Sequence, residues 1–226
     1  MIDSNDLNGS PLLASVPPAD VLRDCPTART LPFAHGDTLY TQGENLRAVF
    51  CVLEGQVTLA RTSAQGASLT IAALAAGDLF GPALDGAAAA EDTARAKGPV
   101  VAWRAPLDEF QHLLLAHPAL SLEVVAYLAR RQRRLERRLE GLAFKGTEAR
   151  LAEIFRELSG GFVTRCEHGF GQHLRLTQQE LADLVGASRP VVSTILNRLR
   201  KQGVLGYNRD YVCVRRIEDL EQLTEP

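Results

Sequence analysis

Short apolar runs separated by glycine turns fill residues 30–104. In chain order they read TLPFA, TLY, AVFCVL, QVTLART, SLTIAALA, DLF, TARAK and VVAWR. Many short strands with regular turn signals are typical of a β-sandwich or a β-roll. Ahead of them, residues 11–29 form a short helical region broken by prolines. The alanine-rich stretch 86–91 is compatible with a loose turn or with a short helix.

The spacing of apolar residues changes at about residue 119 and predicts one helix as far as residue 145, about 40 Å long. Its apolar stripe advances by alternating steps of three and four, which is the seam of a two-stranded coiled coil. The seam residues are Val125, Leu128, Gln132, Leu135, Leu139 and Leu142. The alternative is packing on the chain's own β-domain, but a helix this long projects beyond one roll. We therefore predict a homodimer, with Gln132 fixing the register.

The rest of this helix surface is rich in arginine, and Glu136 and Glu140 stand at one-turn spacing where they can form ion pairs. A break at Gly146 and Thr147 ends the helix. Residues 147–158 predict a further helix, which packs through Leu151, Ile154, Phe155 and Leu158. The hinge between domains is expected near residues 144–147.

Residues 176–203, LTQQELADLVGASRPVVSTILNRLRKQG, contain two helical patterns joined by a tight turn. Thr177 and Glu180 form a capping box at the start of the first. Its apolar face consists of Leu181, Leu184 and Val185. Gly186 ends this helix, because only glycine adopts the left-handed conformation without steric cost. The layout is that of a helix-turn-helix.

The second helix follows Ser188, a suitable N-cap, and it tolerates Pro190 in its first turn. Its buried stripe is Val192, Ile195, Leu196 and Leu199. Such a helix can enter the major groove, where an arginine donates two hydrogen bonds to guanine, and Arg189 is the expected guanine contact. The other expected DNA contacts are Thr177, Gln178, Gln179, Ser188, Pro190, Ser193, Thr194 and Asn197. The alternative is a helical hairpin whose charged face is only solvated.

After Gly203 the stretch VLGYNRDYVCVRRI contains two β-like runs around a turn at residues 208–210. This pattern predicts a β-hairpin wing, with Arg209 at its tip as a candidate phosphate contact. We therefore expect three parts: a β-roll sensor domain at 11–117, a dimerisation helix at 118–145, and a winged helix-turn-helix DNA-binding domain at 146–226.

The chain has 226 residues, 46% of them apolar, and a formal net charge of −2. Acidic residues outnumber basic ones before His117, and the arginine-rich stretch 130–138 reverses the balance afterwards. Because phosphate binding depends on local potential, the acidic first half does not exclude DNA binding. The polar N-terminus is no secretory signal, and no apolar run approaches the roughly 20 residues that span a bilayer. A cytoplasmic protein without a membrane partner is expected.

The cysteines Cys25, Cys51, Cys166 and Cys213 are far apart, and reduced thiols are expected. Cys166, His168 and His173 could bind a metal ion, but they lack a fourth ligand at a recognisable spacing, so no metal is predicted. No nucleophile lies in a pattern with a base, so we do not expect an enzyme.

The order of these parts resembles the Crp/Fnr superfamily of bacterial transcription regulators over nearly the whole chain. In the roll the resemblance rests on QGE at 42–44, LEGQV at 53–57 and GDLFG at 77–81, and residues 176–199 are the more specific match. It implies an α+β fold, with an N-terminal β-roll like a cyclic-nucleotide-binding domain, a long dimerisation helix and a C-terminal winged helix-turn-helix.

The resemblance also implies a homodimer that binds double-stranded DNA at a two-fold operator, with RNA polymerase as a further partner. Arg189 falls on the family's guanine-reading arginine. Pro190 and Thr194 replace a glutamate and an arginine that contact bases in other members. The operator sequence therefore stays open beyond one guanine.

The sensor departs from the members that bind cAMP. Those members have a glutamate after the Phe-Gly pair and an arginine before Ser or Thr ahead of the next strand, where this chain has Pro82 and Ala90-Glu91. The adjacent Thr-Ser of the dimer helix falls on Leu135-Glu136. Because Glu91 would repel a cyclic phosphate and Pro82 offers no acceptor, we expect that cAMP is not the effector, and the effector stays unknown.

No cofactor is predicted. Cys25 stands alone where Fnr-like members carry a cysteine cluster for an iron–sulfur centre. His35, His112 and His117 are possible haem ligands, but such histidines more often lie at the surface or in hydrogen bonds. Two other functions remain open: a cupin-like metal-binding enzyme, for which the roll lacks a His-x-His, and an effector-independent DNA-binding member of the family.

Overall fold

The computed structural model describes residues 13–81, 89–159, 172–208 and 211–214. The chain divides into two compact units, one of residues 1–68 and 72–131 and the other of residues 69–71 and 132–226. No single helix among the described residues is long and apolar enough to cross a membrane. The pair α2 (Leu107–Ala116) and α3 (Pro118–Phe144) passes only when taken together, and it is bent by 114°.

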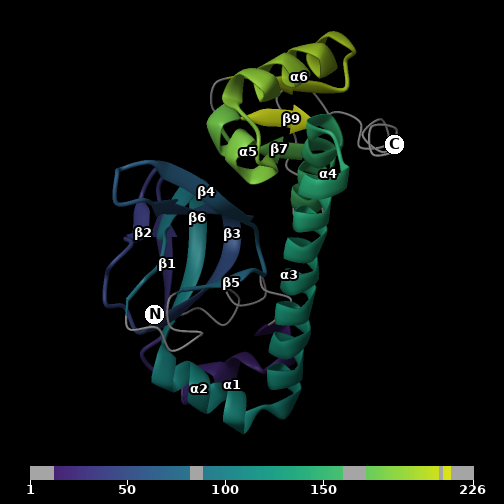
Figure 1. Cartoon of the computed structure of the whole chain (residues 1–226). Coiled ribbons are helices and arrows are strands. Elements are labelled where there is room, and N and C mark those ends of the chain that lie inside the picture. The colour runs from purple at the N-terminus through teal and green to yellow at the C-terminus, as the bar shows by residue number, and fades with distance from the viewer. Residues whose placement is uncertain (1–12, 82–88, 160–171, 209–210, 215–226) are drawn as a thin grey trace. The chain divides into compact units, whose positions relative to one another are not determined.

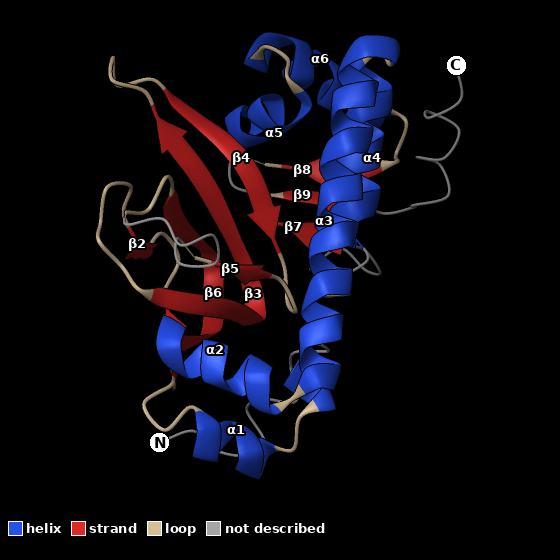
Figure 2. Ribbon diagram, turned by 60° about the horizontal axis from the view of Figure 1, so that its bottom comes forward, coloured by secondary structure: helices blue, strands red, loops and turns tan. Residues whose placement is uncertain are grey.

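A six-stranded sheet forms the N-terminal roll (Figures 1 and 2). Its strands are β1 (Arg29–Phe33), β2 (Thr38–Tyr40), β3 (Ala48–Thr62), β4 (Ser68–Leu74), β5 (Leu79–Phe80) and β6 (Thr93–Pro106). The order is β1-β6-β3-β4, with β2 paired to β6 and β5 paired to β3. The predicted β-roll is confirmed, and its longest ladder joins β3 to β6 in antiparallel register.

The eight predicted runs give six strands because β3 and β6 each continue through a glycine. The register of β3 against β6 shifts between Val52 and Glu54 and again between Glu54 and Gln56. Gly55 lies at this irregularity with φ of 85°, and a Cβ atom there would lie 2.3 Å from the Pro99 carbonyl oxygen. This glycine therefore forms a bulge inside a strand rather than a turn between strands.

Alanine at position 55 should destabilise the protein by about 3 kcal/mol, because left-handed strain adds to a clash with backbone. Gly66→Ala is the matched control, since Gly66 has φ of 83° but nothing within 4 Å of its hypothetical Cβ atom. That control should lose only about 1 kcal/mol. Urea unfolding followed by circular dichroism measures both values, and equal losses would contradict the role of Pro99.

Two short helical elements and α2 close one end of the roll beside the first part of α3 (Figure 1). A 3-10 turn (Leu13–Ser15) precedes α1 (Pro18–Asp24). Trp103 of β6 packs edge-on against Phe110 of α2, with ring centroids 6.2 Å apart, and Leu120 of α3 is fully buried in the same cluster. The sequence did not single out α2, whose apolar face at Leu107, Phe110 and Leu113 completes this core.

Asp24 joins the end of α1 to the start of α3. Its carboxylate accepts a hydrogen bond from Arg23 Nε at 2.8 Å and lies 2.9 Å from His117 Nε2. The hydrogen bonds from Arg23 and then His117 lower the pKa of Asp24 to about 2. Because the pKa is lowered in the folded state, Asp24 stabilises the fold at neutral pH, and this contribution is lost as the pH falls towards 2.

The second unit combines helices with a three-stranded antiparallel sheet. Its elements are the later part of α3, α4 (Thr147–Ser159), β7 (Gln172–Leu174), α5 (Gln178–Val185), α6 (Arg189–Lys201), β8 (Leu205–Tyr207) and β9 (Val212–Val214). The strand order β7-β9-β8 confirms the hairpin after α6 and adds β7, which the sequence did not reveal. Cys213 of β9 is disulfide-bonded, so the expectation of reduced cysteines is wrong for this residue, while Cys25 and Cys51 are buried thiols outside any disulfide.

Candidate DNA-binding surface

The capping box at the start of α5 is present. Glu180 N donates to Thr177 Oγ1 at 3.2 Å, and Thr177 N donates to Glu180 Oε2 at 2.8 Å. The Thr177 hydroxyl also donates to the same carboxylate at 3.0 Å. These bonds fix the first turn of α5, as the sequence predicts, and they leave the Thr177 hydroxyl without a spare proton for a phosphate.

Gly186 ends α5 in the left-handed conformation, with φ of 62° and ψ of 48°. Gly186 N donates to Asp183 O at 3.2 Å and Ala187 N donates to Ala182 O at 3.0 Å, which is the Schellman pattern. Ser188 then adopts an extended conformation as the N-cap of α6. The turn between the two helices is therefore built from backbone hydrogen bonds around one glycine.

The inner stripe of α6 is buried as predicted. Val192, Ile195, Leu196 and Leu199 are at most 8% exposed. The opposite face begins with Ser188, Arg189 and Pro190, all of them exposed. Within the part of the chain that the structure describes, the Ser188 hydroxyl makes no capping hydrogen bond. The start of α6 therefore presents a guanidinium, a hydroxyl and free backbone amides to solvent, which is what a phosphate or a base edge requires.

Several of the other residues predicted to contact DNA form side-chain hydrogen bonds within their own domain. Gln179 Nε2 donates to Asp183 Oδ1 at 2.8 Å, one turn along α5. Thr194 is exposed, and its Oγ1 donates to Pro190 O at 3.0 Å, so the methyl group and the lone pairs of the hydroxyl oxygen remain open to a partner. Gln178 and Ser193 are half-buried and, among the described residues, have no side-chain hydrogen bond.

Asn197 is tied to the hairpin. Its Oδ1 accepts hydrogen bonds from Tyr207 Oη at 2.8 Å and from Arg200 NH2 at 3.3 Å. The Arg200 guanidinium also lies 5.0 Å from the centre of the Tyr207 ring. Arg198 forms an ion pair with Glu148 of α4. Contacts within the domain thus hold the second half of α6 in place. No local signal in the sequence indicated that Tyr207 contributes to them. Arg209 lies outside the described residues.

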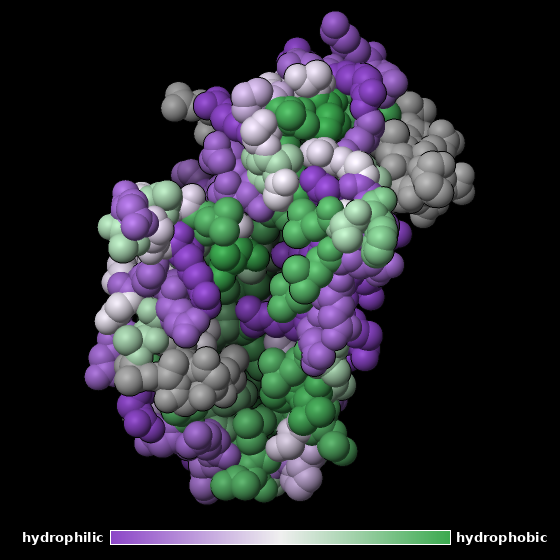
Figure 3. Space-filling view, in the orientation of Figure 1, coloured by the Kyte–Doolittle hydropathy of each residue, from purple (hydrophilic) through white to green (hydrophobic). Residues whose placement is uncertain are grey.

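The seam of α3 is apolar and uncovered in one chain. Its leucines and valine are between 43% and 67% exposed: Val125, Leu128, Leu135, Leu139 and Leu142. Gln132 is exposed too, and its Nε2 donates to Glu136 Oε1 at 2.9 Å. Figure 3 shows such apolar side chains (green) interspersed with polar ones (purple) along α3. Each of these side chains therefore keeps much of its surface exposed to solvent in a single chain.

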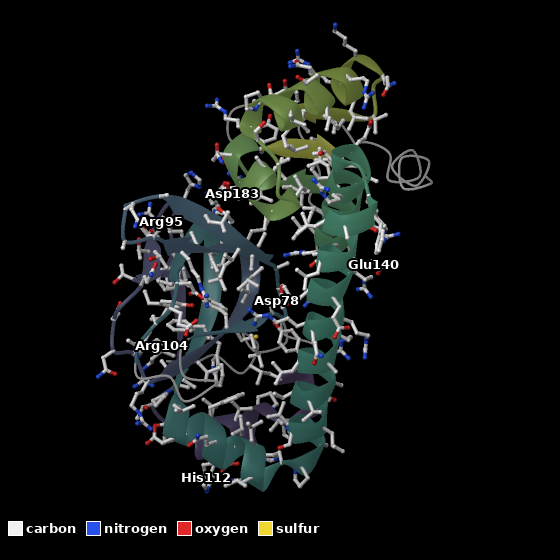
Figure 4. The ribbon with its side chains drawn as sticks, in the orientation of Figure 1. Asp78, Arg95, Arg104, His112, Glu140 and Asp183 are labelled. Atoms are coloured by element: carbon white, nitrogen blue, oxygen red, sulfur yellow. The ribbon has the colours of Figure 1, made fainter. Side chains whose placement is uncertain are left out.

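Another face of α3 is occupied by the roll. Val124 and Tyr127 belong to the roll's buried core, and the Tyr127 hydroxyl lies 3.1 Å from Asp78 Oδ1 and 3.1 Å from Leu79 O. Arg131 also donates to Leu79 O, at 3.2 Å. Figure 4 shows Asp78 on the side of the roll that faces this helix. Burial raises the pKa of Tyr127, so its hydroxyl stays protonated and can donate here.

The positions compared above with those of cAMP-binding proteins make their contacts within the roll. Ala90 is buried, and Glu91 forms an exposed ion pair with Arg61 of β3. Next to them, Tyr40 Oη donates to Asp92 Oδ1 at 2.7 Å. The rings of Tyr40, Phe50 and Phe80 form an aromatic cluster, with the last two centroids 5.2 Å apart. Pro82 lies outside the described residues.

The histidines and cysteines form no metal site in the described ranges, where no group of three potential ligands was found. His35 Nδ1 accepts from Gly98 N at 3.0 Å, and His117 is paired with Asp24. His112 is exposed on α2. Cys166, His168 and the side chain of His173 lie outside the described residues.

Two family models match separate parts of the chain, one on each side of α3. Residues 30–117 match the cyclic nucleotide-binding domain, and residues 149–223 match the Crp-like helix-turn-helix domain. Both matches fall on the elements described above: the first on the roll and α2, the second on α4 to β9.

Similarity to individual proteins extends over most of the chain. The cyclic AMP receptor protein of Thermus thermophilus is 29% identical over 225 residues, which cover 96% of this chain and 98% of that protein. The global nitrogen regulator of a Nostoc species is 26% identical over 88% of this chain and 92% of its own length. The crystal structure of a CRP/FNR-family transcriptional regulator from Thermus thermophilus superposes with a TM-score of 0.70 at 26% identity, covering 88% of this chain and 99% of that one.

Proposed function

Because the chain belongs to the Crp/Fnr superfamily of transcription regulators, we propose that it acts as a homodimer on a two-fold DNA operator. Its α+β architecture joins a cyclic nucleotide-binding domain to a Crp-like helix-turn-helix. The exposed start of α6 supports the proposal most directly, since Arg189 stands there on a helix whose opposite face is fully buried. In a dimer two such helices would read half-sites about one helical turn apart, and the protein would work in the cytoplasm with RNA polymerase as a partner.

Arg189 is the base-reading residue in this proposal. Its position in the first turn of α6 is the one from which a guanidinium can reach guanine O6 and N7. Ser188, Gln178 and the backbone amides at the starts of α5 and α6 supply phosphate contacts. Thr194 offers a methyl group and an acceptor, while Asn197 acts by holding the hairpin.

Arg189→Ala should weaken binding to the preferred operator about tenfold to a hundredfold, because one bidentate guanine contact contributes roughly 1–3 kcal/mol of discrimination. Mobility shift with operator DNA selected from a random pool measures this. Lys201→Ala, at the other end of α6, is the control and should affect specific and non-specific duplexes alike. If Arg189→Ala binds all sites as tightly as the wild type, the assignment is wrong.

Dimerisation through α3 is supported by the contrast between its buried face and its exposed face. Leu120, Val124 and Tyr127 are buried by the roll, whereas the seam stays exposed in a single chain. Two seams packed together would remove this apolar surface from water, at roughly 25 cal/mol for each Å² buried. The hydrogen bond from Gln132 to Glu136 uses only one of the amide protons of Gln132. Gln132 can therefore still bond to the partner helix and set the register of the pair.

Leu139→Glu should convert the dimer to a monomer, since two carboxylates would then face each other within the apolar seam. Leu115→Glu is the matched control, because Leu115 is a leucine of α2 that is 83% exposed and lies outside the seam. Analytical ultracentrifugation at micromolar concentration gives the result. A wild-type monomer, or a Leu139→Glu dimer, would contradict the proposed interface.

The effector is proposed to be something other than cAMP, although the roll matches the cyclic nucleotide-binding domain and one relative is named a cyclic AMP receptor protein. The carboxylate of Glu91 supports this, because it stands where a cyclic phosphate would need a positive charge. Arg61, the cation that the structure places beside Glu91, is already engaged in an ion pair with this carboxylate, and the buried Ala90 next to it carries no charge. An effector-independent regulator satisfies the same observations.

Calorimetric titration with cAMP should give no binding to the wild type up to about 1 mM. Glu91→Gln removes the opposing charge while keeping the shape, so it should bind cAMP measurably if repulsion is the cause. Micromolar affinity in the wild type would overturn the proposal. A cupin-like enzyme has no observation in its favour, because the described part of the roll brings no ligand group together.

A further inference from the structure

A cavity of about 170 Å³ lies in the second unit between the end of α3, α4 and the end of α5. Its volume is close to the ~150 Å³ of an engineered protein cavity that binds benzene. The apolar part of its lining is Leu142, Ile154, Leu184 and Val185. One ring-sized apolar group would therefore be accommodated against these four side chains.

Five arginines line the same cavity: Arg134, Arg137, Arg138, Arg150 and Arg156. The lining contains only two carboxylates, and both are already paired. Glu157 accepts two hydrogen bonds from Arg138, at 3.0 and 3.1 Å, and Glu153 accepts one from Lys145 at 2.5 Å. Positive charge is therefore in excess around an apolar floor.

These arginines differ in how many hydrogen bonds they form within the protein. Arg150 is bonded to its own domain, since its Nε donates to Val185 O at 2.8 Å and its NH1 to Lys145 O at 2.9 Å. Arg137 and Arg156 are exposed, and within the described ranges neither has a hydrogen bond or an ion pair. These two guanidinium groups remain available to an anion from solution.

Arg138 gives a second and independent observation. Its Nε is buried and has no hydrogen-bond partner in the part of the chain that is described. A buried donor without an acceptor destabilises a fold, and a small rotation of this guanidinium towards a bound oxyanion would give Nε the acceptor that it lacks. A phosphate monoester suits these donors better than a carboxylate, because it brings three terminal oxygens and close to two negative charges.

We propose that this cavity binds a small phosphate monoester that carries a ring-sized apolar group. The ring would rest on Ile154 and Leu184, and the phosphate would lie among Arg137, Arg138 and Arg156. A DNA backbone is a poorer occupant, since its diesters carry one charge and no apolar group. A ligand here would contact three helices at once, and α5 leads through Gly186 directly into α6. Any effect on operator binding rests on the proposed function, whereas binding itself does not.

The test is calorimetric titration of the full-length protein with phenyl phosphate, in the absence of DNA. Phenyl phosphate should bind at least tenfold more tightly than inorganic phosphate or phenol, because it alone uses both parts of the cavity. Arg137→Gln and Arg156→Gln should each weaken its binding about tenfold, which is the loss expected for one charged hydrogen bond. Arg133→Gln is the matched control, as an exposed arginine of α3 that does not line the cavity.

Unfolding temperatures without ligand check that the variants are intact, and they should equal that of the wild type. Three results would each overturn the proposal: no binding of phenyl phosphate at millimolar concentration, equal binding by the wild type and both arginine variants, or equal binding of phenyl phosphate and inorganic phosphate. Because no DNA is present, a failure here leaves the operator-binding proposal untouched, and a failure to bind operators leaves this measurement valid.

Discussion

The direction of α6 depends on one backbone reversal at Gly186. Its left-handed conformation ends α5, and only one further residue separates it from the N-cap of α6. The missing side chain also matters for packing, since a Cβ atom at Gly186 would lie 2.6 Å from Leu142 Cδ2 of α3. One position therefore sets both the angle between the two helices and how closely α3 approaches their turn. Every proposed contact between α6 and DNA follows from it.

A single helix, α3, serves three kinds of contact on different faces. Its first half covers the roll with Val124 and Tyr127, and its second half holds α4 through the ion pairs of Arg138 and Arg134 with Glu157. The sequence had suggested one-turn pairs with Glu136 and Glu140 for such arginines. In the structure Arg138 instead bonds Glu157 of α4, and Glu136 accepts a hydrogen bond from Gln132. The exposed seam residues lie on the surface that these contacts leave open, and Leu142 at the end of the seam also approaches Gly186.

Local signals in the sequence were enough for the helix-turn-helix. The Thr177–Glu180 capping box, the turn at Gly186 and the buried stripe of α6 involve residues within a few positions of each other, and all are found as predicted. The same reasoning failed where residues distant in the sequence determine the local structure. Gly55 was taken for a turn but is a bulge, because the fold places Pro99 beside it.

Long-range contacts also decide how far the candidate site could be predicted. The exposure of Ser188 and Arg189 follows from helical periodicity alone. The hydrogen bond from Tyr207 to Asn197 does not, since it depends on the hairpin folding back on α6. Strand β7 was missed because three residues carry too little pattern to be recognised, and α2 because its apolar face appears only once the roll lies against it.

The seam on α3 also limits how this chain can change over evolutionary time. Val125 and Leu128 lie before Gln132, and Leu135, Leu139 and Leu142 lie after it, on one continuous helix. Each residue of an α-helix advances the side-chain direction by about 100°. One inserted or deleted residue near Gln132 would turn the later leucines away from the earlier stripe, whereas a single substitution leaves the stripe aligned. Relatives that share this mode of pairing should therefore vary in composition along the helix while keeping its length, or change it only by whole heptads.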